Sequence, residues 1–208
     1  MDEYFEQTEH AVRHAYAGLD SCWSYVERAQ HYAPTPVREG NMLALYPPAT
    51  PEEEEKSRHH GELLEKYFEL KFSETMFAGF VLQTAHMAIS LYSPCRAVPE
   101  SCFAFVNPEN TRAAPFCIGK ERYGVPTGLV VYAGRNQYAH WDEKNPHPTT
   151  ERVFQALNVA FANNAFADLA FSLSNPGISI FAGEVLFTAL DWRSYETYVA
   201  EMTELLRE

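Results

Sequence analysis

Residues 51–91 decide the fold, and they read PEEEEKSRHHGELLEKYFELKFSETMFAGFVLQTAHMAISL. No proline interrupts the stretch after its first residue, and its apolar side chains recur at helical steps. These side chains cover more than half of the helix circumference and are Leu63, Leu64, Tyr67, Phe68, Met76, Phe77, Phe80 and Val81. A helix with so wide an apolar surface contacts two or more neighbours, so we expect it at the centre of a helical bundle.

The start of this helix carries the signals of an N-terminus. Thr50 can serve as the N-cap, Pro51 fits the first helical position, and acidic side chains follow in the first turn. Negative charge is favourable there because the helix dipole is positive at that end. We therefore predict that the helix begins directly after Thr50.

Four further helices are predicted around it. Residues 2–32 have one apolar stripe made by Phe5, Val12, Tyr16, Leu19, Trp23 and Val26. Shorter helices are expected over 126–141, 149–173 and 192–207. Together they predict an all-α helical bundle that occupies residues 1–208 as a single domain.

The connections are long and rich in proline. Residues 33–51 contain five prolines, which block helical continuation, and we expect a loop there. Residues 93–124 are expected to be irregular, with one short helical turn. Ile178-Ser179-Ile180 alternates and Gly183 separates it from Val185-Leu186-Phe187, a pattern compatible with a short C-terminal β-hairpin.

Composition and charge restrict the classes of function. The chain has 208 residues, 16 basic and 28 acidic side chains, and a formal net charge of −12. Nucleic-acid-binding domains are usually basic, so any RNA contact is expected to be local.

No stretch approaches the length of apolar sequence that spans a bilayer, and the N-terminus begins Met1-Asp2-Glu3 where a signal peptide would be basic. We expect a cytoplasmic protein that makes no membrane contact.

The candidate chemistry lies in one segment, Tyr132-Ala133-Gly134-Arg135-Asn136-Gln137-Tyr138-Ala139-His140-Trp141-Asp142-Glu143. On a helix, Asn136 and His140 are about 40° apart, so the carboxamide can orient the imidazole. Arg135 and His140 are about 140° apart, so one regular helix cannot direct both at one small group. They would need long side chains, local unwinding at Gly134, or a second copy of the segment.

Arginine, a polar orienting residue and histidine suit metal-independent RNA cleavage. Histidine can take the 2′-OH proton or protonate the leaving 5′-oxygen, because its ordinary pKa is near neutral. Arginine can neutralise the charge that builds on the phosphate. We therefore predict catalytic roles for Arg135 as phosphate stabiliser, His140 as general acid or base, and Asn136 as the residue that orients His140.

The run Arg135-Asn136-x3-His140 resembles the Arg-x(4–6)-His signature of the HEPN superfamily over about residues 126–143. The resemblance implies a bundle of four or five helices, and a homodimer in which two motifs form one cleft. It also implies an endoribonuclease of toxin–antitoxin or phage-defence systems, with an antitoxin or other regulatory protein as partner. Some HEPN proteins are catalytically silent, so a module that binds RNA, a nucleotide or a protein without cutting is the alternative.

Four residues near the motif are candidate RNA contacts. Lys120 and Arg122 belong to a locally basic stretch and could hold phosphates, or could form surface ion pairs with the acidic helices. Tyr138 and Trp141 could stack on bases, although aromatic residues on a helix also pack in cores and dimer interfaces.

A metal-dependent hydrolase is the third hypothesis. His10 and His14 have metal-ligand spacing, and His59, His60, Glu62 or His86 could join a site in a bundle. However, His10 and His14 lie opposite the apolar stripe of their helix, where solvent is expected.

Cys22, Cys95, Cys102 and Cys117 form no CxxC pair, so we expect reduced, mostly buried thiols. No metal and no cofactor are predicted.

Overall fold

The computed structural model divides into two compact units, Met1–Tyr16 with Thr75–Glu208 and Ala17–Glu74. Two helices, α1 and α2, contribute residues to both units. The structure describes residues 1–34, 37–39, 42–44, 48, 50–140, 142, 146–161, 171–172 and 182–207.

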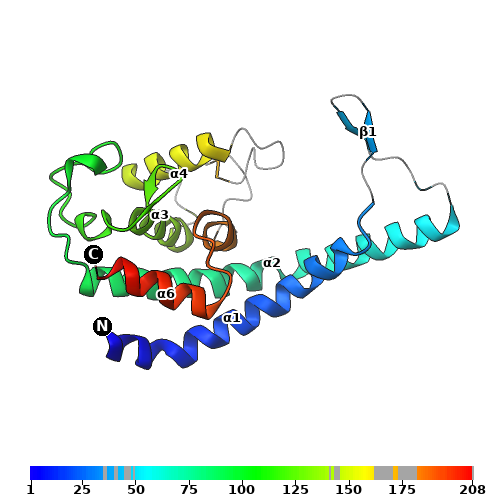
Figure 1. Cartoon of the computed structure of the whole chain (residues 1–208), viewed down its shortest axis with the longest axis horizontal. Helices are drawn as coiled ribbons and strands as arrows, with labels where there is room; N and C mark the ends of the chain where they lie inside the picture. Colours follow the sequence, from blue (N-terminus) through cyan, green and yellow to red (C-terminus); the bar gives the residue numbers. More distant parts are fainter. Residues whose placement is uncertain are drawn as a thin grey trace. The chain divides into compact units, whose positions relative to one another are not determined.

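The described elements are mostly helical (Figure 1), which confirms the all-α fold class. The α-helices are α1 (Asp2–Gln30), α2 (Pro51–Tyr92), α3 (Thr127–Ala139), α4 (Pro148–Phe161), α5 (Ala182–Glu184) and α6 (Tyr195–Leu205). Short 3₁₀-helices are η1 (Glu100–Cys102) and η2 (Ala114–Phe116), and η4 (Val185–Ala189) is a π-helix. Two antiparallel strand pairs are β1 (Val37–Glu39) with β2 (Met42–Ala44), and β3 (Glu121–Arg122) with β4 (Val125–Pro126).

Helix α3 is the centre of the first unit. Its residues 127–134 are buried, and in Figure 1 it lies between α4 and the C-terminal part of α2. Gly134 permits this packing, because a Cβ there would come within 2.6 Å of Val185 and 3.3 Å of Leu82. A helix with apolar residues on all sides is stable only when it is surrounded in this way.

The N-terminus of α2 has the predicted cap. The Glu53 amide donates to Thr50 Oγ1 at 3.2 Å, and the Thr50 amide donates to the Glu53 carboxylate at 3.2 Å. This reciprocal pair is a capping box, which satisfies two amides that the helix leaves without intrahelical acceptors. The prediction for Thr50 is confirmed.

In the second unit, the parts of α1 and α2 within it run antiparallel and are joined by a buried carboxylate. Glu74 is only 1% exposed, and it accepts hydrogen bonds from Tyr67 Oη at 2.8 Å and Trp23 Nε1 at 3.5 Å. Lys71 Nζ lies 3.0 Å from the same carboxylate and supplies its counter-charge. Burial is the main cause that raises the pKa of Tyr67 to about 12.

Two segments differ from the sequence-based expectations. The proline-rich stretch 33–51, expected to be a loop, contains the antiparallel pair β1 and β2. The expected C-terminal hairpin is wrong over residues 185–187, which lie in the π-helix η4. The buried residues Ala182, Val185, Leu186 and Ala189 recur at steps of three and four, so the helical period outweighs the short alternation there. Residues 178–180 lie outside the described residues.

Candidate functional site

Helix α3 ends inside the candidate motif. It runs to Ala139, two residues short of the predicted end, and His140 is its C-cap with φ −126° and ψ 36°. The His140 amide still donates to the Asn136 carbonyl at 2.9 Å, which completes the last turn. His140 is exposed, so its imidazole lies at the open end of the buried helix.

A pocket of about 280 Å³ opens beside this helix end. It is lined by Tyr132, Asn136, Gln137, His140, Pro146, His147 and Thr150. Two of the three predicted catalytic residues, Asn136 and His140, therefore share one pocket. None of the described residues that line it is acidic, although the chain carries a net charge of −12.

His147 is the site residue that sequence reasoning missed. Its carbonyl accepts from the Glu151 amide at 3.0 Å, and its Nδ1 accepts from the Thr149 amide at 3.3 Å, so His147 caps α4. Because Nδ1 is an acceptor, the neutral ring carries its proton on Nε2. A histidine directly before Pro148, which occupies the first helical position, was the available signal for this cap.

Arg135 does not line the pocket but is connected to it. Its Nε donates to Gln83 Oε1 on α2 at 2.7 Å, and its Nη1 donates to Asn136 Oδ1 at 3.2 Å. The guanidinium thus links α2 to a pocket residue. As expected from their separation around the helix, Arg135 and His140 of one chain are not directed at the same small space.

His86 of α2 lies close to this arginine. Its ring stacks against Tyr132 with centroids 6.1 Å apart and lies 4.5 Å from Phe116. Burial, and to a smaller extent the Arg135 charge, lowers the pKa of His86 from its ordinary 6.5 to about 4. His86 is therefore neutral at neutral pH, which suits a residue of α2 that packs against the pocket residue Tyr132.

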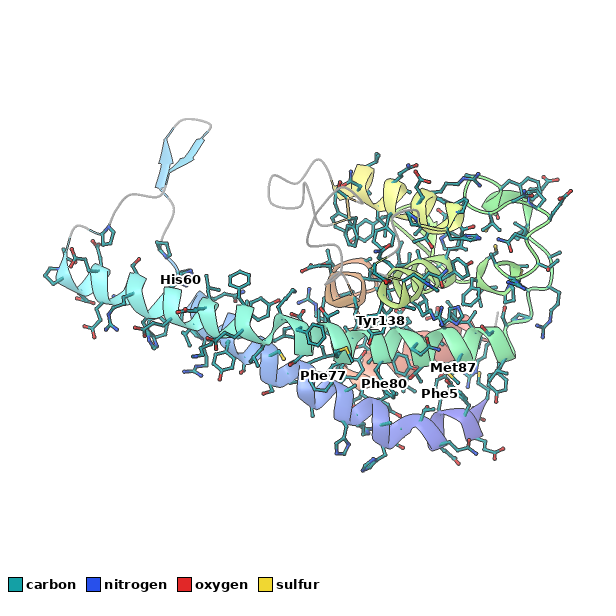
Figure 2. The ribbon with its side chains drawn as sticks, turned by 180° about the vertical axis from the view of Figure 1, so that it is seen from behind. Phe5, His60, Phe77, Phe80, Met87 and Tyr138 are labelled. Atoms are coloured by element: carbon teal, nitrogen blue, oxygen red, sulfur yellow. The ribbon has the colours of Figure 1, made fainter. Side chains whose placement is uncertain are left out.

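The four candidate RNA contacts are placed differently. Lys120 and Arg122 both pair with Glu201 of α6, at 2.5 Å and 2.9 Å, so the surface ion-pair alternative describes their contacts. Tyr138 lies beside α2 (Figure 2). Its ring packs against Gly79, and its hydroxyl donates to Met76 Sδ at 3.4 Å. Trp141 lies outside the described residues. An RNA-binding role for these side chains stays a prediction.

The other histidines and the four cysteines, all of which the structure describes, form no recognisable metal centre. Among the described residues, no group of three or more His, Cys, Asp or Glu side chains is arranged to hold a metal ion. His10 and His14 are exposed neighbours with ring centroids 4.3 Å apart. All four cysteines are free thiols. Three of them, Cys95, Cys102 and Cys117, line one surface pocket, an arrangement that their scattered sequence positions do not reveal.

Comparison of the chain with family models, with curated proteins and with solved structures finds no match. The HEPN resemblance therefore rests on the residues of this chain alone. In the part of the chain that the structure describes, no helix is both long and apolar enough to cross a membrane.

Proposed function

We propose that this protein is a metal-independent endoribonuclease of HEPN type. The observation that carries the proposal is the placement of Asn136 and His140 in one pocket whose described lining contains no acidic residue, with Arg135 hydrogen-bonded to Asn136. Because no described lining residue would repel an anion, the pocket can accept a phosphodiester. His140 provides a proton-transfer group at the exposed edge of the pocket.

The reaction needs only groups that this kind of site supplies. A histidine removes the 2′-OH proton, and the 2′-oxygen attacks the adjacent phosphorus. The bond from phosphorus to the 5′-oxygen then breaks, and a general acid protonates that oxygen. The products are a 2′,3′-cyclic phosphate and a free 5′-OH, with no water consumed. Arg135 stabilises the charge on the phosphate oxygens, for which a guanidinium is well suited.

An exposed apolar face on α2 supports the proposed homodimer. Four side chains on it are exposed although they are apolar: Met76 47%, Phe80 41%, Met87 46% and Leu91 58%. They fall within about 60° of the helix circumference, and Gln83 lies about 20° from Met76. Because Gln83 holds Arg135, a second copy packed on this face would bring two arginines toward one shared cleft.

A module that binds RNA without cutting is the second candidate. It is favoured by one observation, the engagement of Arg135 by Gln83 and Asn136 away from the pocket lining. If Arg135 keeps these two partners in the presence of RNA, the phosphate charge would lack its stabiliser. The two candidates differ in a single outcome, which is whether RNA is cleaved.

The test is the chemistry of the product ends. Purified protein is incubated in EDTA with a labelled single-stranded RNA, and with the same RNA carrying 2′-deoxy nucleotides at the cleaved positions. The proposal expects cyclic phosphate ends from the first RNA and no cleavage of the second. Cleavage of the deoxy-substituted RNA, or strict dependence on a divalent metal, would overturn the proposed reaction. Growth inhibition on expression in bacteria is the matching readout for a toxin or defence effector.

A further inference from the structure

The pocket beside His140 contains a buried hydroxyl that has no hydrogen-bond partner in the described part of the chain. Thr150 is 1% exposed and lines the pocket, and its Oγ1 has no hydrogen-bond partner among the described residues. A buried hydroxyl without a partner is costly, since most such groups in native structures are satisfied. A ligand in the pocket that accepts a hydrogen bond would remove this cost.

The hydroxyl belongs to the first turn of α4, which spans Pro148–Phe161. The N-terminus of a helix presents backbone amides and the positive end of the dipole, which together favour an anion. Pro148 occupies the first helical position and has no amide N–H, and the Thr149 and Glu151 amides already donate to His147. Further donors near the pocket must therefore come from side chains.

The side chains around Thr150 add donors. His147 uses Nδ1 to accept from the Thr149 amide, which leaves Nε2–H as its donor. Asn136 uses Oδ1 to accept from Arg135, which leaves its NH₂ group as the donating end. A pocket with donors at the start of a helix, and without an acidic side chain in its described lining, suits a tetrahedral oxyanion.

We propose that this pocket binds a phosphate group at the N-terminus of α4, with Thr150 Oγ1 and His147 Nε2 donating to its oxygens. The site stands on the pocket geometry. Only the assignment of the phosphate to RNA rests on the proposed function, under which the reacting phosphodiester would lie next to His140. Thr150 and His147 are then binding residues that the Arg135-Asn136-x3-His140 pattern does not contain.

The test uses inorganic phosphate and the full chain. Binding is measured by isothermal titration calorimetry at neutral pH for the wild type, Thr150→Val, Thr150→Ser and Thr149→Val. Thr149 is equally buried and precedes Thr150 in the same turn, but it does not line the pocket, so it is the matched control. We expect Thr150→Val to weaken phosphate binding by about tenfold or more, because a hydrogen bond to a charged group is lost. Thr150→Ser and Thr149→Val should bind like the wild type.

A second arm identifies the source of the phosphate. A short RNA with 2′-O-methyl groups cannot react, so its competition with inorganic phosphate reports binding alone. Competition assigns the site to RNA phosphates, and its absence assigns it to a free phosphate. No phosphate binding by the wild type, or equal weakening in Thr150→Val and Thr149→Val, would overturn the site. RNA cleavage measured in parallel keeps failure of the site distinct from failure of the ribonuclease proposal.

Discussion

Asn136 Oδ1 accepts a hydrogen bond from Arg135 Nη1 at 3.2 Å, while the same guanidinium donates through Nε to Gln83 at 2.7 Å. Arg135 and Asn136, which are adjacent in the sequence, are therefore hydrogen-bonded to each other. Together they connect α2 to the pocket that contains His140. Arginine can make both contacts because its donors are arranged in a rigid fork.

The variant Arg135→Lys tests whether the geometry of the guanidinium matters for RNA cleavage. Lysine has one flexible ammonium group in place of the planar guanidinium, so Arg135→Lys cannot reproduce both hydrogen bonds in the same geometry. We expect the rate of RNA cleavage to fall about tenfold to 100-fold, with the fold retained, as checked by circular dichroism. A rate equal to that of the wild type would show that only the positive charge matters.

The titration of His86 tests the environment next to Arg135. Burial is the main cause that lowers its pKa to about 4, and the Arg135 charge adds to the effect. The unfolded chain binds a proton on His86 at its ordinary pKa of 6.5, whereas the folded chain keeps His86 neutral down to about pH 4. The neutral, buried His86 therefore makes its full contribution to folding stability above pH 6.5. This contribution is lost as the pH falls from 6.5 toward 4.

Histidine ring signals in NMR spectra measure this directly. His86 should stay neutral between pH 5 and pH 8, and Arg135→Gln should raise its pKa while burial keeps it below 6.5. Titration of His86 near 6.5 in the wild type would contradict the buried position that the structure gives it.

The contact of α2 with Tyr138 depends on Gly79. A Cβ at this position would overlap the Tyr138 ring, so Gly79→Ala must displace the ring or the helix. We expect a loss of about 1–3 kcal/mol in the free energy of unfolding, measured by urea denaturation. Gly61 is the control, since a Cβ there meets nothing within 4 Å. Gly61→Ala should instead stabilise α2 by about 0.5–1 kcal/mol, and equal effects of the two changes would refute the close packing.

Two lysine–glutamate pairs on α2 have the same spacing and different burial. Lys71–Glu74 is nearly buried, with side chains 13% and 2% exposed, whereas Lys66–Glu69 has side chains 58% and 56% exposed. Glu74→Gln leaves the Lys71 ammonium without its counter-charge, and we expect a loss of about 2 kcal/mol in urea denaturation. Glu69→Gln should leave the unfolding free energy nearly unchanged, because exposed pairs contribute little. Similar losses for both would contradict the burial of Glu74.

Local signals predicted the start of α2 well, but not every helix end. The helix predicted over 149–173 is observed as α4 over Pro148–Phe161, and residues 171–172 are not helical. The cap at Thr50 and the long helix after it follow from side chains within one turn, and they are confirmed. The β1–β2 pair was missed because the density of proline in residues 33–51 indicated a loop. Residues 185–187 were misinterpreted because three apolar residues fit either a strand or a helix, and only their burial pattern decides between the two.

The candidate site was predictable only in part. Arg135, Asn136 and His140 were visible as a spaced pattern on one segment. The contributions of His147 and Thr150 were not, because they depend on how the start of α4 lies against the end of α3. Likewise, the positions of Lys120 and Arg122 near the motif in sequence did not reveal that both pair with Glu201.

In the proposed reaction, His140 performs proton transfer. The most direct measurement is the cleavage rate of a single-stranded RNA in EDTA by the wild type, His140→Ala and His10→Ala, where His10 is an exposed histidine on α1 outside the pocket. We predict that His140→Ala lowers the rate by about 100-fold or more, since acid–base catalysis contributes at least that factor, and that His10→Ala cleaves like the wild type. Equal rates for the wild type and His140→Ala would contradict proton transfer by His140.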